Sequence, residues 1–447
     1  MKSHAIRGAA LITTSLVAAS VVAGGAAATA ATAAAGGHEL TVVDSTVITE
    51  VTPLGLKVTG LAVEYDGVVH VGRDAIDEDA FDVEATLERP GAEPLVGDRT
   101  VVDAYTNRTP EFTDRQRPGR FVILELHEND DLAGASYNDV YTRFYDLDGA
   151  YDVAQVMDID ARPHTIEAQP GNVLANSAVD TLIVDEYDGG TFDAEAGVTL
   201  PYRMYSPDVT GRKTYPLVVT LHGYGESGTN NVSQIAGNQI SVAFADPERQ
   251  ARHPAFVLSP QADPLTPDTG GWWDPPMQEA VVELVRKTLA ENPAIDPDRV
   301  YLTGLSMGSY GSWGLLPEYH DLFAGAILVC GAGGDEAAAA STLGEFPIWA
   351  VHSIDDSIVA YDQPGSDYRI FTAIEAAGYP VTWSEWAGTA PDAAQEAYAA
   401  EARDRALATR SNHIFTTFPA GTTPLFDHGS WIPTYTNDVI IDWLFAQ

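Results

Sequence analysis

The stretch that most constrains the fold is residues 301–311, YLTGLSMGSYG, where an apolar β-like run stops at Ser306 and a helix-like run begins. Gly304, Ser306 and Gly308 have the spacing G-x-S-x-G. A serine in so sharp a turn needs neighbours without side chains, because strand and helix approach each other closely there. The turn exposes the hydroxyl and points a helix N-terminus at any oxyanion formed beside it. The pattern predicts a nucleophilic serine; an ordinary Gly/Ser turn is the alternative.

A second glycine-rich turn, HGYGESG at residues 222–228, follows the strand-like run at 216–221. A backbone N–H that stabilises an oxyanion must come close to a carbonyl oxygen, which favours such a turn. We assign the two oxyanion donors to the N–H groups of Tyr224 and Met307. His222 precedes the serine, whereas the order expected for this kind of site is serine, acid, histidine. We therefore expect His222 to hold the turn structurally.

The acid is expected just beyond a strand end, in WAVHSIDDSIV at residues 349–359. A carboxylate there can fix the tautomer of an imidazole and stabilise the imidazolium. We choose Asp356, with Asp355 as the second candidate and Asp335 as a distant third. Composition alone does not separate Asp355 from Asp356.

Two histidines, His413 and His428, lie after these acids in the chain. His428 falls in a loop before the final helix-like stretch, where a base can lie over the serine. His413 precedes a β-like run. Chain order and loop position favour His428 as the base.

Two adjacent tryptophans, Trp272 and Trp273, follow the strand-like run at residues 255–258 in the sequence GGWWDPP. They are candidates for an acyl or aromatic substrate pocket. Core aromatics are the equal alternative.

From about residue 187 onward, apolar strand-like runs alternate with helical patterns. Strands are expected at 216–221, 255–258, 300–305, 325–329, 346–351 and 381–386, and helices at 232–245, 277–291, 308–322, 368–377 and 437–445. This alternation predicts a mostly parallel sheet covered on both faces, with ligands at the carboxyl ends of the strands. Residues 388–410 read as a further amphipathic helix that either caps the cleft or decorates the surface.

The region from about residue 40 to 186 consists of short β-like runs separated by turn-rich gaps, which is typical of a β-sandwich. We place the domain boundary at Glu186, giving domains at 38–186 and 187–447. Acidic stretches at 74–79 and 128–131 could bind calcium, but neither has EF-hand spacing. Solvated loops are the favoured interpretation.

The first 35 residues carry Lys2 and Arg7, an apolar stretch from 9 to 23 and an alanine-rich end. This pattern predicts a secretory signal peptide at 1–35 and an exported mature chain that does not insert into a membrane. With 64 acidic and 24 basic residues, the formal charge of −40 disfavours nucleic acid and anionic membrane surfaces as partners. Cys330 is the only cysteine, so no intrachain disulfide forms.

Three segments together resemble secreted esterases of the α/β-hydrolase superfamily: residues 221–228, residues 298–308, and HGSW at 428–431. The nearest group is the predicted-peptidase or polyhydroxybutyrate-depolymerase-like one, whose members include carboxylesterases with an N-terminal immunoglobulin-like domain. Residues 40–186 are similar to that domain in length and strand pattern. In that group the acid usually lies four residues after His-Gly, which His352-Ser353 replaces here, so Asp355 stays open.

The resemblance implies an α/β-hydrolase fold preceded by an immunoglobulin-like sandwich, and a serine carboxylesterase with Ser306 as nucleophile, Asp356 as acid and His428 as base. Its substrate would be a small or polymeric ester, with no metal or organic cofactor. The N-terminal domain would shape the cleft or assist homo-oligomer formation. The rival functions are a serine peptidase, a polyester or feruloyl ester hydrolase, and an inert secreted binding protein.

Overall fold

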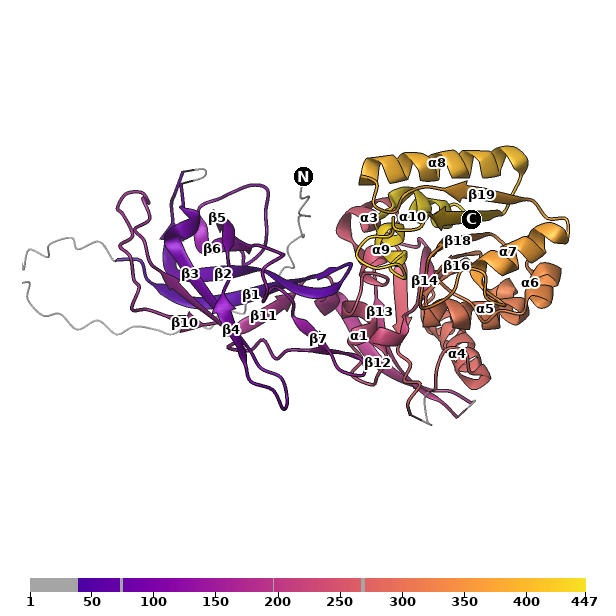
Figure 1. Cartoon of the computed structure of the whole chain (residues 1–447). Helices are drawn as coiled ribbons and strands as arrows, with labels where there is room; N and C mark the ends of the chain where they lie inside the picture. Colours follow the sequence, from indigo (N-terminus) through magenta and orange to yellow (C-terminus); the bar gives the residue numbers. More distant parts are fainter. Residues whose placement is uncertain (1–38, 73–74, 196, 267–269) are drawn as a thin grey trace, which may run out of the picture.

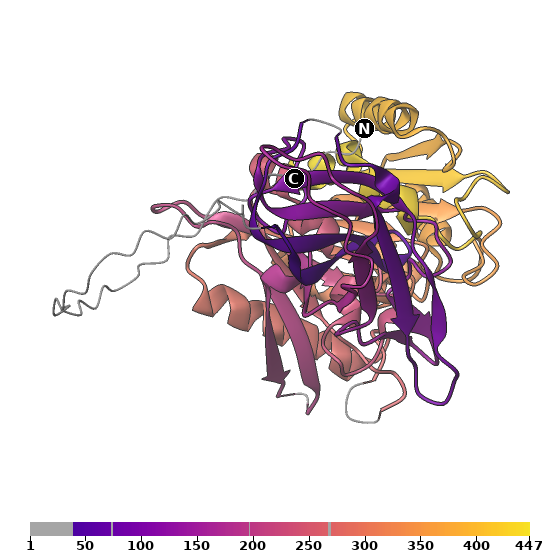
Figure 2. The same cartoon turned by 90° about the vertical axis from the view of Figure 1, so that its left-hand side faces the viewer.

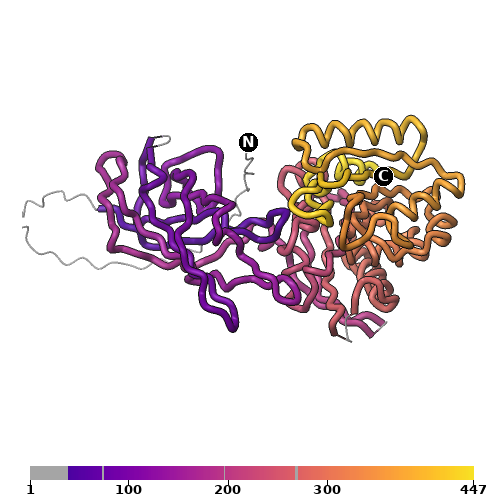
Figure 3. Tube along the Cα trace, viewed as in Figure 1, coloured from indigo at the N-terminus to yellow at the C-terminus, as the bar shows by residue number. Residues whose placement is uncertain are grey.

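The computed structural model describes residues 39–72, 75–195, 197–266 and 270–447. The chain forms a β-rich N-terminal part followed by an α/β part, lying side by side (Figures 1 and 3). Seen from its N-terminal side, the β-rich part lies in front of the other (Figure 2). The signal peptide predicted at 1–35 lies outside the described residues. In the described ranges, no helix is both long enough and apolar enough to cross a bilayer.

The N-terminal part is a sandwich of two β-sheets around one apolar core. One sheet has the order β11-β1-β2-β6-β5 and the other β10-β9-β3-β4. Alternate residues of β3 (Phe81–Leu87) are buried, because one face of the strand packs on the core and the other faces solvent. The remaining strands are β1 (Val42–Thr52), β2 (Gly55–Val69), β4 (Leu95–Asp98), β5 (Val101–Asn107), β6 (Gly119–Leu126), β9 (Tyr151–Gln155), β10 (Leu174–Ala175) and β11 (Ala178–Thr181).

The acidic stretches of this part are tied into its own structure. The Asp77 carboxylate caps the short 3-10 helix η1 (Glu78–Ala80) by accepting from the N–H of Asp79. Asp130 accepts hydrogen bonds from the Arg99 guanidinium and from the N–H of Thr100. Both carboxylates have structural partners within the sandwich.

A hairpin made of β7 (Ser136–Asn138) and β8 (Thr142–Phe144) reaches from the sandwich to the α/β part (Figure 1). Ser233, in helix α1 (Ser233–Ala236), donates a hydrogen bond of 3.2 Å to the carbonyl oxygen of Thr142. The two parts are thus joined by packing as well as by the chain.

The α/β part is built on a nine-stranded sheet with the order β12-β13-β15-β14-β16-β17-β18-β20-β19. The first two strands pair antiparallel and the other seven run parallel. From β14 the chain passes to β15 on one side and then to β16 on the other, so the carboxyl ends of β14 and β16 flank a topological switch point. The strands are β12 (Tyr187–Asp193), β13 (Thr199–Tyr205), β14 (Tyr215–Leu221), β15 (Phe256–Pro260), β16 (Ile295–Leu305), β17 (Gly325–Val329), β18 (Ile348–Ser353), β19 (Val381–Glu385) and β20 (His413–Phe418).

Helices cover both faces of this sheet, so every residue of β14 and β17 is buried. One face packs on α4 (Pro275–Glu291), α5 (Met307–Tyr319), α6 (Glu336–Thr342) and α7 (Asp367–Ala376). The other face packs on α1, α2 (Val242–Ala245), α8 (Asp392–Thr409), α9 (Trp431–Thr436) and α10 (Asp438–Phe445), with α3 (Pro247–Arg252) following α2. Figure 1 shows α8 and α10 on the side of the sheet opposite α4 and α5.

Two predicted helices differ from the structure. The helix expected at 232–245 is two short helices, α1 and α2, because bends at residues 237–239 interrupt it. The helix expected at 388–410 is α8, whose Ala399, Ala402 and Ala406 pack in the core on one face of the sheet. It is a regular layer of the fold, neither a cap nor a surface decoration.

Candidate active site

Ser306 occupies the turn between β16 and α5 in a strained backbone conformation, with φ 50° and ψ −117°. Such a conformation costs on the order of 1–3 kcal/mol and persists where the surroundings enforce it. A Cβ on Gly304 would lie 2.5 Å from the carbonyl group of Gly308, and a Cβ on Gly308 would lie 1.8 Å from the carbonyl oxygen of Leu221. Both glycines of the motif are therefore needed for strand and helix to approach each other.

The three predicted catalytic side chains meet at the carboxyl ends of the strands. His428 Nε2 lies 2.9 Å from Ser306 Oγ, and His428 Nδ1 lies 2.6 Å from Asp356 Oδ2. Both His428 and Asp356 are 5% exposed. With Nδ1–H donating to the carboxylate, Nε2 is free to accept the serine proton.

The carboxylate of Asp356 is held from several sides. Its Oδ1 accepts hydrogen bonds from the N–H groups of Ile358 and Val359, at 2.9 and 2.8 Å. Burial alone would raise the pKa of Asp356, but hydrogen bonds from His352 and His428 outweigh it and hold this pKa well below its usual range. Asp356 is thus ionised wherever the protein is folded near neutral pH.

The alternative acids and base are engaged elsewhere. Asp355 accepts a hydrogen bond of 2.7 Å from the N–H of Gly421. Asp335 caps α6 through the N–H groups of its first turn. His413 is fully buried, and its Nε2 lies 2.9 Å from the carbonyl oxygen of Leu343.

The two assigned oxyanion donors stand at helix starts beside the serine. Met307 begins α5, and Tyr224 begins the 3-10 helix η3 (Tyr224–Glu226), so neither N–H has an acceptor within its own helix. A Cβ on Gly223 would lie 3.7 Å from Ser306 Cβ. The glycine-rich turn therefore lies directly against the serine.

His222 holds this turn, as expected from the sequence. Its Nε2 accepts from the N–H of Ala262 at 3.0 Å, which leaves the proton on Nδ1, 2.6 Å from the carbonyl oxygen of Gly223. Burial lowers the pKa of His222 to about 4, so its ring is neutral.

Comparison with known proteins shows the family to which the chain belongs. Residues 44–168 match the family model of the esterase Ig-like N-terminal domain. Among solved structures, a thermostable esterase has 30% sequence identity and a TM-score of 0.72, over 90% of this chain and 99% of that chain. The chain belongs to the family of esterases with an immunoglobulin-like N-terminal domain. The esterase is a carboxylic ester hydrolase, and its α/β-hydrolase fold with a preceding sandwich is the one that the resemblance implied.

Two other solved structures cover a smaller share of the esterase. An S-formylglutathione hydrolase from Agrobacterium tumefaciens has 14% identity and a TM-score of 0.36, over 58% of this chain and 94% of that chain. Est1E from Butyrivibrio proteoclasticus has 13% identity and a TM-score of 0.35, over 58% of this chain and 99% of that chain. Comparison with curated protein sequences gives no match.

The two tryptophans of the esterase have different surroundings. Trp272 is 1% exposed, and its Nε1–H donates to the carbonyl oxygen of His222 at 3.1 Å. It is a core aromatic packed against the glycine-rich turn at 222–228, which corrects its predicted place in the pocket. Trp273 is 46% exposed and packs edge-on against Tyr310, one turn after Ser306. A contact between Trp273 and the substrate stays a prediction.

The β7–β8 hairpin brings a residue that sequence reasoning missed. The hydroxyl of Tyr141 donates a hydrogen bond of 2.9 Å to Asp263 in the loop after β15. Its ring packs edge-on against Tyr224, with 5.4 Å between the ring centroids. No local motif marks Tyr141, because its partners lie far away in the chain and in the other domain.

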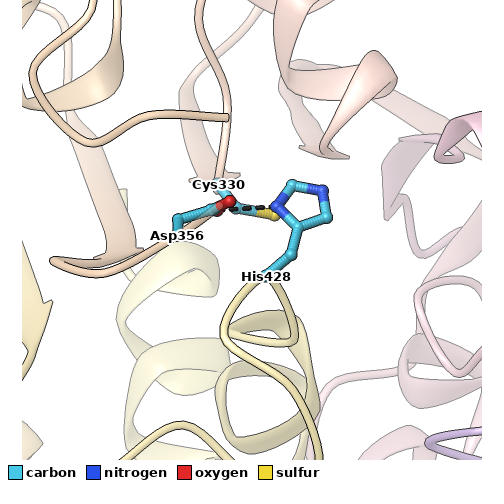
Figure 4. A group of neighbouring side chains, drawn as sticks. All are labelled: Cys330, Asp356 and His428. Carbon is cyan, nitrogen blue, oxygen red and sulfur yellow. Dashed lines mark hydrogen bonds and ion pairs between the residues drawn. The ribbon is translucent and has the colours of Figure 1, made fainter. Parts of the chain in front are cut away.

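One group of side chains in the described ranges is close enough to share a metal ion. It consists of Cys330, Asp356 and His428, whose ligand atoms lie within 4.8 Å of one another (Figure 4). Burial raises the pKa of the Cys330 thiol well above its usual value, which keeps it protonated. The other two side chains bind each other, so a metal here would have to break the bond that orients His428.

Proposed function

We propose that the esterase hydrolyses carboxylic esters through an acyl-enzyme on Ser306, with His428 as general base and Asp356 as the acid that orients it. The observation that supports this proposal is the hydrogen-bonded chain from Ser306 Oγ through the imidazole to Asp356, with distances of 2.9 and 2.6 Å. These lie within hydrogen-bond reach of a competent nucleophile and base.

The first half of the reaction forms the acyl-enzyme. His428 Nε2 takes the proton of Ser306 as Oγ attacks the ester carbonyl, and the N–H groups of Tyr224 and Met307 stabilise the tetrahedral oxyanion. When the intermediate collapses, the ester C–O bond breaks and His428 gives its proton to the leaving alcohol. Asp356 stabilises the transient imidazolium without becoming protonated.

Water completes the cycle in the second half. His428 removes a proton from the water as it attacks the acyl carbonyl, and the same two N–H groups hold the second oxyanion. Collapse returns the proton to Ser306 Oγ and releases the carboxylic acid. The free enzyme is regenerated, and the chain's own residues carry every proton transfer.

The proposal extends to where the enzyme meets its substrate. The signal-peptide pattern at residues 1–35 supports export of the mature chain. The formal charge of −40 suits an uncharged ester better than an anionic one. Small and polymeric esters both fit this description, and the N-terminal part contributes Tyr141, whose ring packs against Tyr224.

A labelling experiment and a paired assay test the proposal. A fluorophosphonate probe should label the wild-type chain but not Ser306→Ala, while Ser341→Ala, which changes an exposed serine of α6, should label normally. The purified chain should hydrolyse short p-nitrophenyl esters faster than peptide p-nitroanilides. Absent labelling would favour an inert binding protein, and amide turnover without ester turnover would favour a peptidase.

A further inference from the structure

A second buried charge pair lies behind the carboxylate of Asp356. His352, near the end of β18, has its side chain fully buried. Its Nδ1 lies 3.0 Å from Asp367 Oδ2. Its Nε2 lies 2.9 Å from the carbonyl oxygen of Val359 and 3.3 Å from Asp356 Oδ2. Both ring nitrogens therefore face groups that accept hydrogen bonds.

Asp367, the first residue of α7, is surrounded by donors. It accepts from the indole N–H of Trp313 at 2.5 Å, from the N–H of Gly331 at 2.6 Å and from the hydroxyl of Ser309 at 3.4 Å. The indole and the backbone N–H can only donate. Such a set of donors stabilises an ionised carboxylate, so the proton shared with His352 belongs on the ring.

From these contacts we infer that His352 is a buried imidazolium, held by Asp367, that positions the carboxylate of Asp356 and keeps it ionised. An unprotonated Nδ1 would face the carboxylate of Asp367, and an unprotonated Nε2 would face two acceptor oxygens. The inference rests on the proposed function, because it gives His352 a role through Asp356 as the catalytic acid. His352 is thus a positioning residue for the reaction.

The electrostatics agree with this assignment. Burial alone would lower the pKa of His352, but hydrogen bonds to Asp356 and Asp367 raise it to about 9. Tyr361 faces the ring edge-on at 5.7 Å, and burial raises its pKa to about 12. Tyr310 and Cys330, near the two carboxylates, also have raised pKa values because of burial. These three neighbours are neutral near pH 7, and His428 is the other imidazole that contacts Asp356.

The buried cation has a consequence for the pH dependence of the reaction. A positive charge behind Asp356 opposes the addition of a further proton to the Asp356–His428 pair. The active form, with His428 able to accept the serine proton, therefore extends to lower pH. His352, the histidine that this chain shares with the His-Gly motif, thereby gains a role that the triad alone does not explain.

The pH profile of kcat/KM separates this role from simple packing. In His352→Gln the low-pH side of the kcat/KM profile should shift to higher pH by about one unit. At a given pH on that side, this shift is about a tenfold loss of kcat/KM. The matched control is His413→Gln, which removes a buried histidine that contacts the carbonyl oxygen of Leu343. In this control the low-pH side of the profile should not shift. Lower activity in His352→Gln with no shift of the low-pH side would overturn the inference.

Nitrogen NMR of the histidine-labelled wild-type chain gives a direct readout that needs no turnover. Near pH 7 both ring nitrogens of His352 should carry protons, and in Asp367→Asn this doubly protonated signal should be lost. The Asp367→Asn variant also identifies the signal if His352→Gln does not fold. A singly protonated His352 in the wild type would overturn the inference. Failure of Ser306 labelling would instead count against the proposed function, so the two failures are distinguishable.

Discussion

The ring of Tyr141, from the N-terminal sandwich, packs edge-on against the ring of Tyr224, the residue assigned as an oxyanion donor, with 5.4 Å between the centroids. The N-terminal domain therefore touches the turn on which the proposed chemistry depends. Both ends of this contact are anchored, since the Tyr141 hydroxyl binds Asp263 and the Tyr224 backbone belongs to η3.

Removing this contact should lower activity more than stability. Tyr141→Phe loses the hydrogen bond to Asp263 but keeps the ring, and it should reduce kcat/KM by about threefold to tenfold, since a hydrogen bond contributes about 0.5–1.5 kcal/mol. Tyr141→Ala also loses the ring contact and should cost more. Tyr137→Phe, in the same hairpin, packs on Tyr145 instead and serves as the control. Equal kinetics in Tyr141→Ala and the wild type would show that the hairpin has no part in catalysis.

The two adjacent aspartates should differ sharply when each is changed to asparagine. Asp356→Asn should lower kcat by about 10⁴-fold, because the amide cannot hold the correct histidine tautomer. Asp355→Asn should retain most activity, because Asp355 binds the backbone of Gly421. Steady-state ester hydrolysis by the two folded variants decides the matter. A larger loss in Asp355→Asn would reverse the assignment of the acid.

Stability should fall at alkaline pH as His352 loses its proton. Its pKa is raised from 6.5 to about 9, so its contribution is fully present below pH 6.5 and is lost as pH rises through about 9. The loss should be about 3 kcal/mol in the free energy of unfolding. Urea unfolding at pH 7 and pH 10 measures this decrease in the free energy of unfolding. The control variant His413→Gln should show the same decrease as the wild type. In His352→Gln the free energy of unfolding should decrease much less between pH 7 and pH 10. A decrease equal to that of the wild type would contradict the prediction.

A methyl group at Gly308 should disrupt the serine turn. The added Cβ would lie 1.8 Å from the carbonyl oxygen of Leu221, so strand and helix would have to separate. Gly308→Ala should destabilise the fold by about 3 kcal/mol or more and remove fluorophosphonate labelling. In the control variant Gly171→Ala the added Cβ meets nothing within 4 Å. This variant should keep the stability and the fluorophosphonate labelling of the wild type. Normal labelling of Gly308→Ala would show that the close approach is dispensable.

Much of the site could be predicted because its residues carry local signals. The glycines around Ser306 follow from the close approach of α5 to β16 and to the end of β14, and the chain order favours His428 over His222. The choice between Asp355 and Asp356 needed the structure, because both follow the same strand. Only their hydrogen-bond partners distinguish them, since Asp356 binds His428 and Asp355 binds the backbone of Gly421.

The parts that sequence did not predict depend on contacts between distant segments. Tyr141 meets Tyr224 across two domains, and Asp367 meets His352 from a helix whose own pattern shows only an apolar face. Trp272 and Trp273 are adjacent in sequence, yet one packs in the core and the other faces solvent. Local periodicity carries no information on such pairings.

Similar reasons explain the errors in element boundaries. Strand β16 begins at Ile295, five residues earlier than predicted, because Ile295 pairs with Tyr215 at the start of β14. The register then shifts over the charged segment with Pro297, which reads as a turn, before Val300 pairs with Leu217. The sequence marks residues 414–418 only as a β-like run, whereas they belong to β20, which lies between β18 and β19 in the sheet.

The most direct test is to trap the covalent intermediate. A reaction with a p-nitrophenyl ester would be quenched in acid within the first turnover, and the digested chain analysed by mass spectrometry. In the wild type, we expect an acyl group on the peptide that contains Ser306. The Ser306→Ala variant should show neither this acyl group nor ester hydrolysis. Undiminished ester hydrolysis by Ser306→Ala, or an acyl group on a different residue, would contradict this prediction.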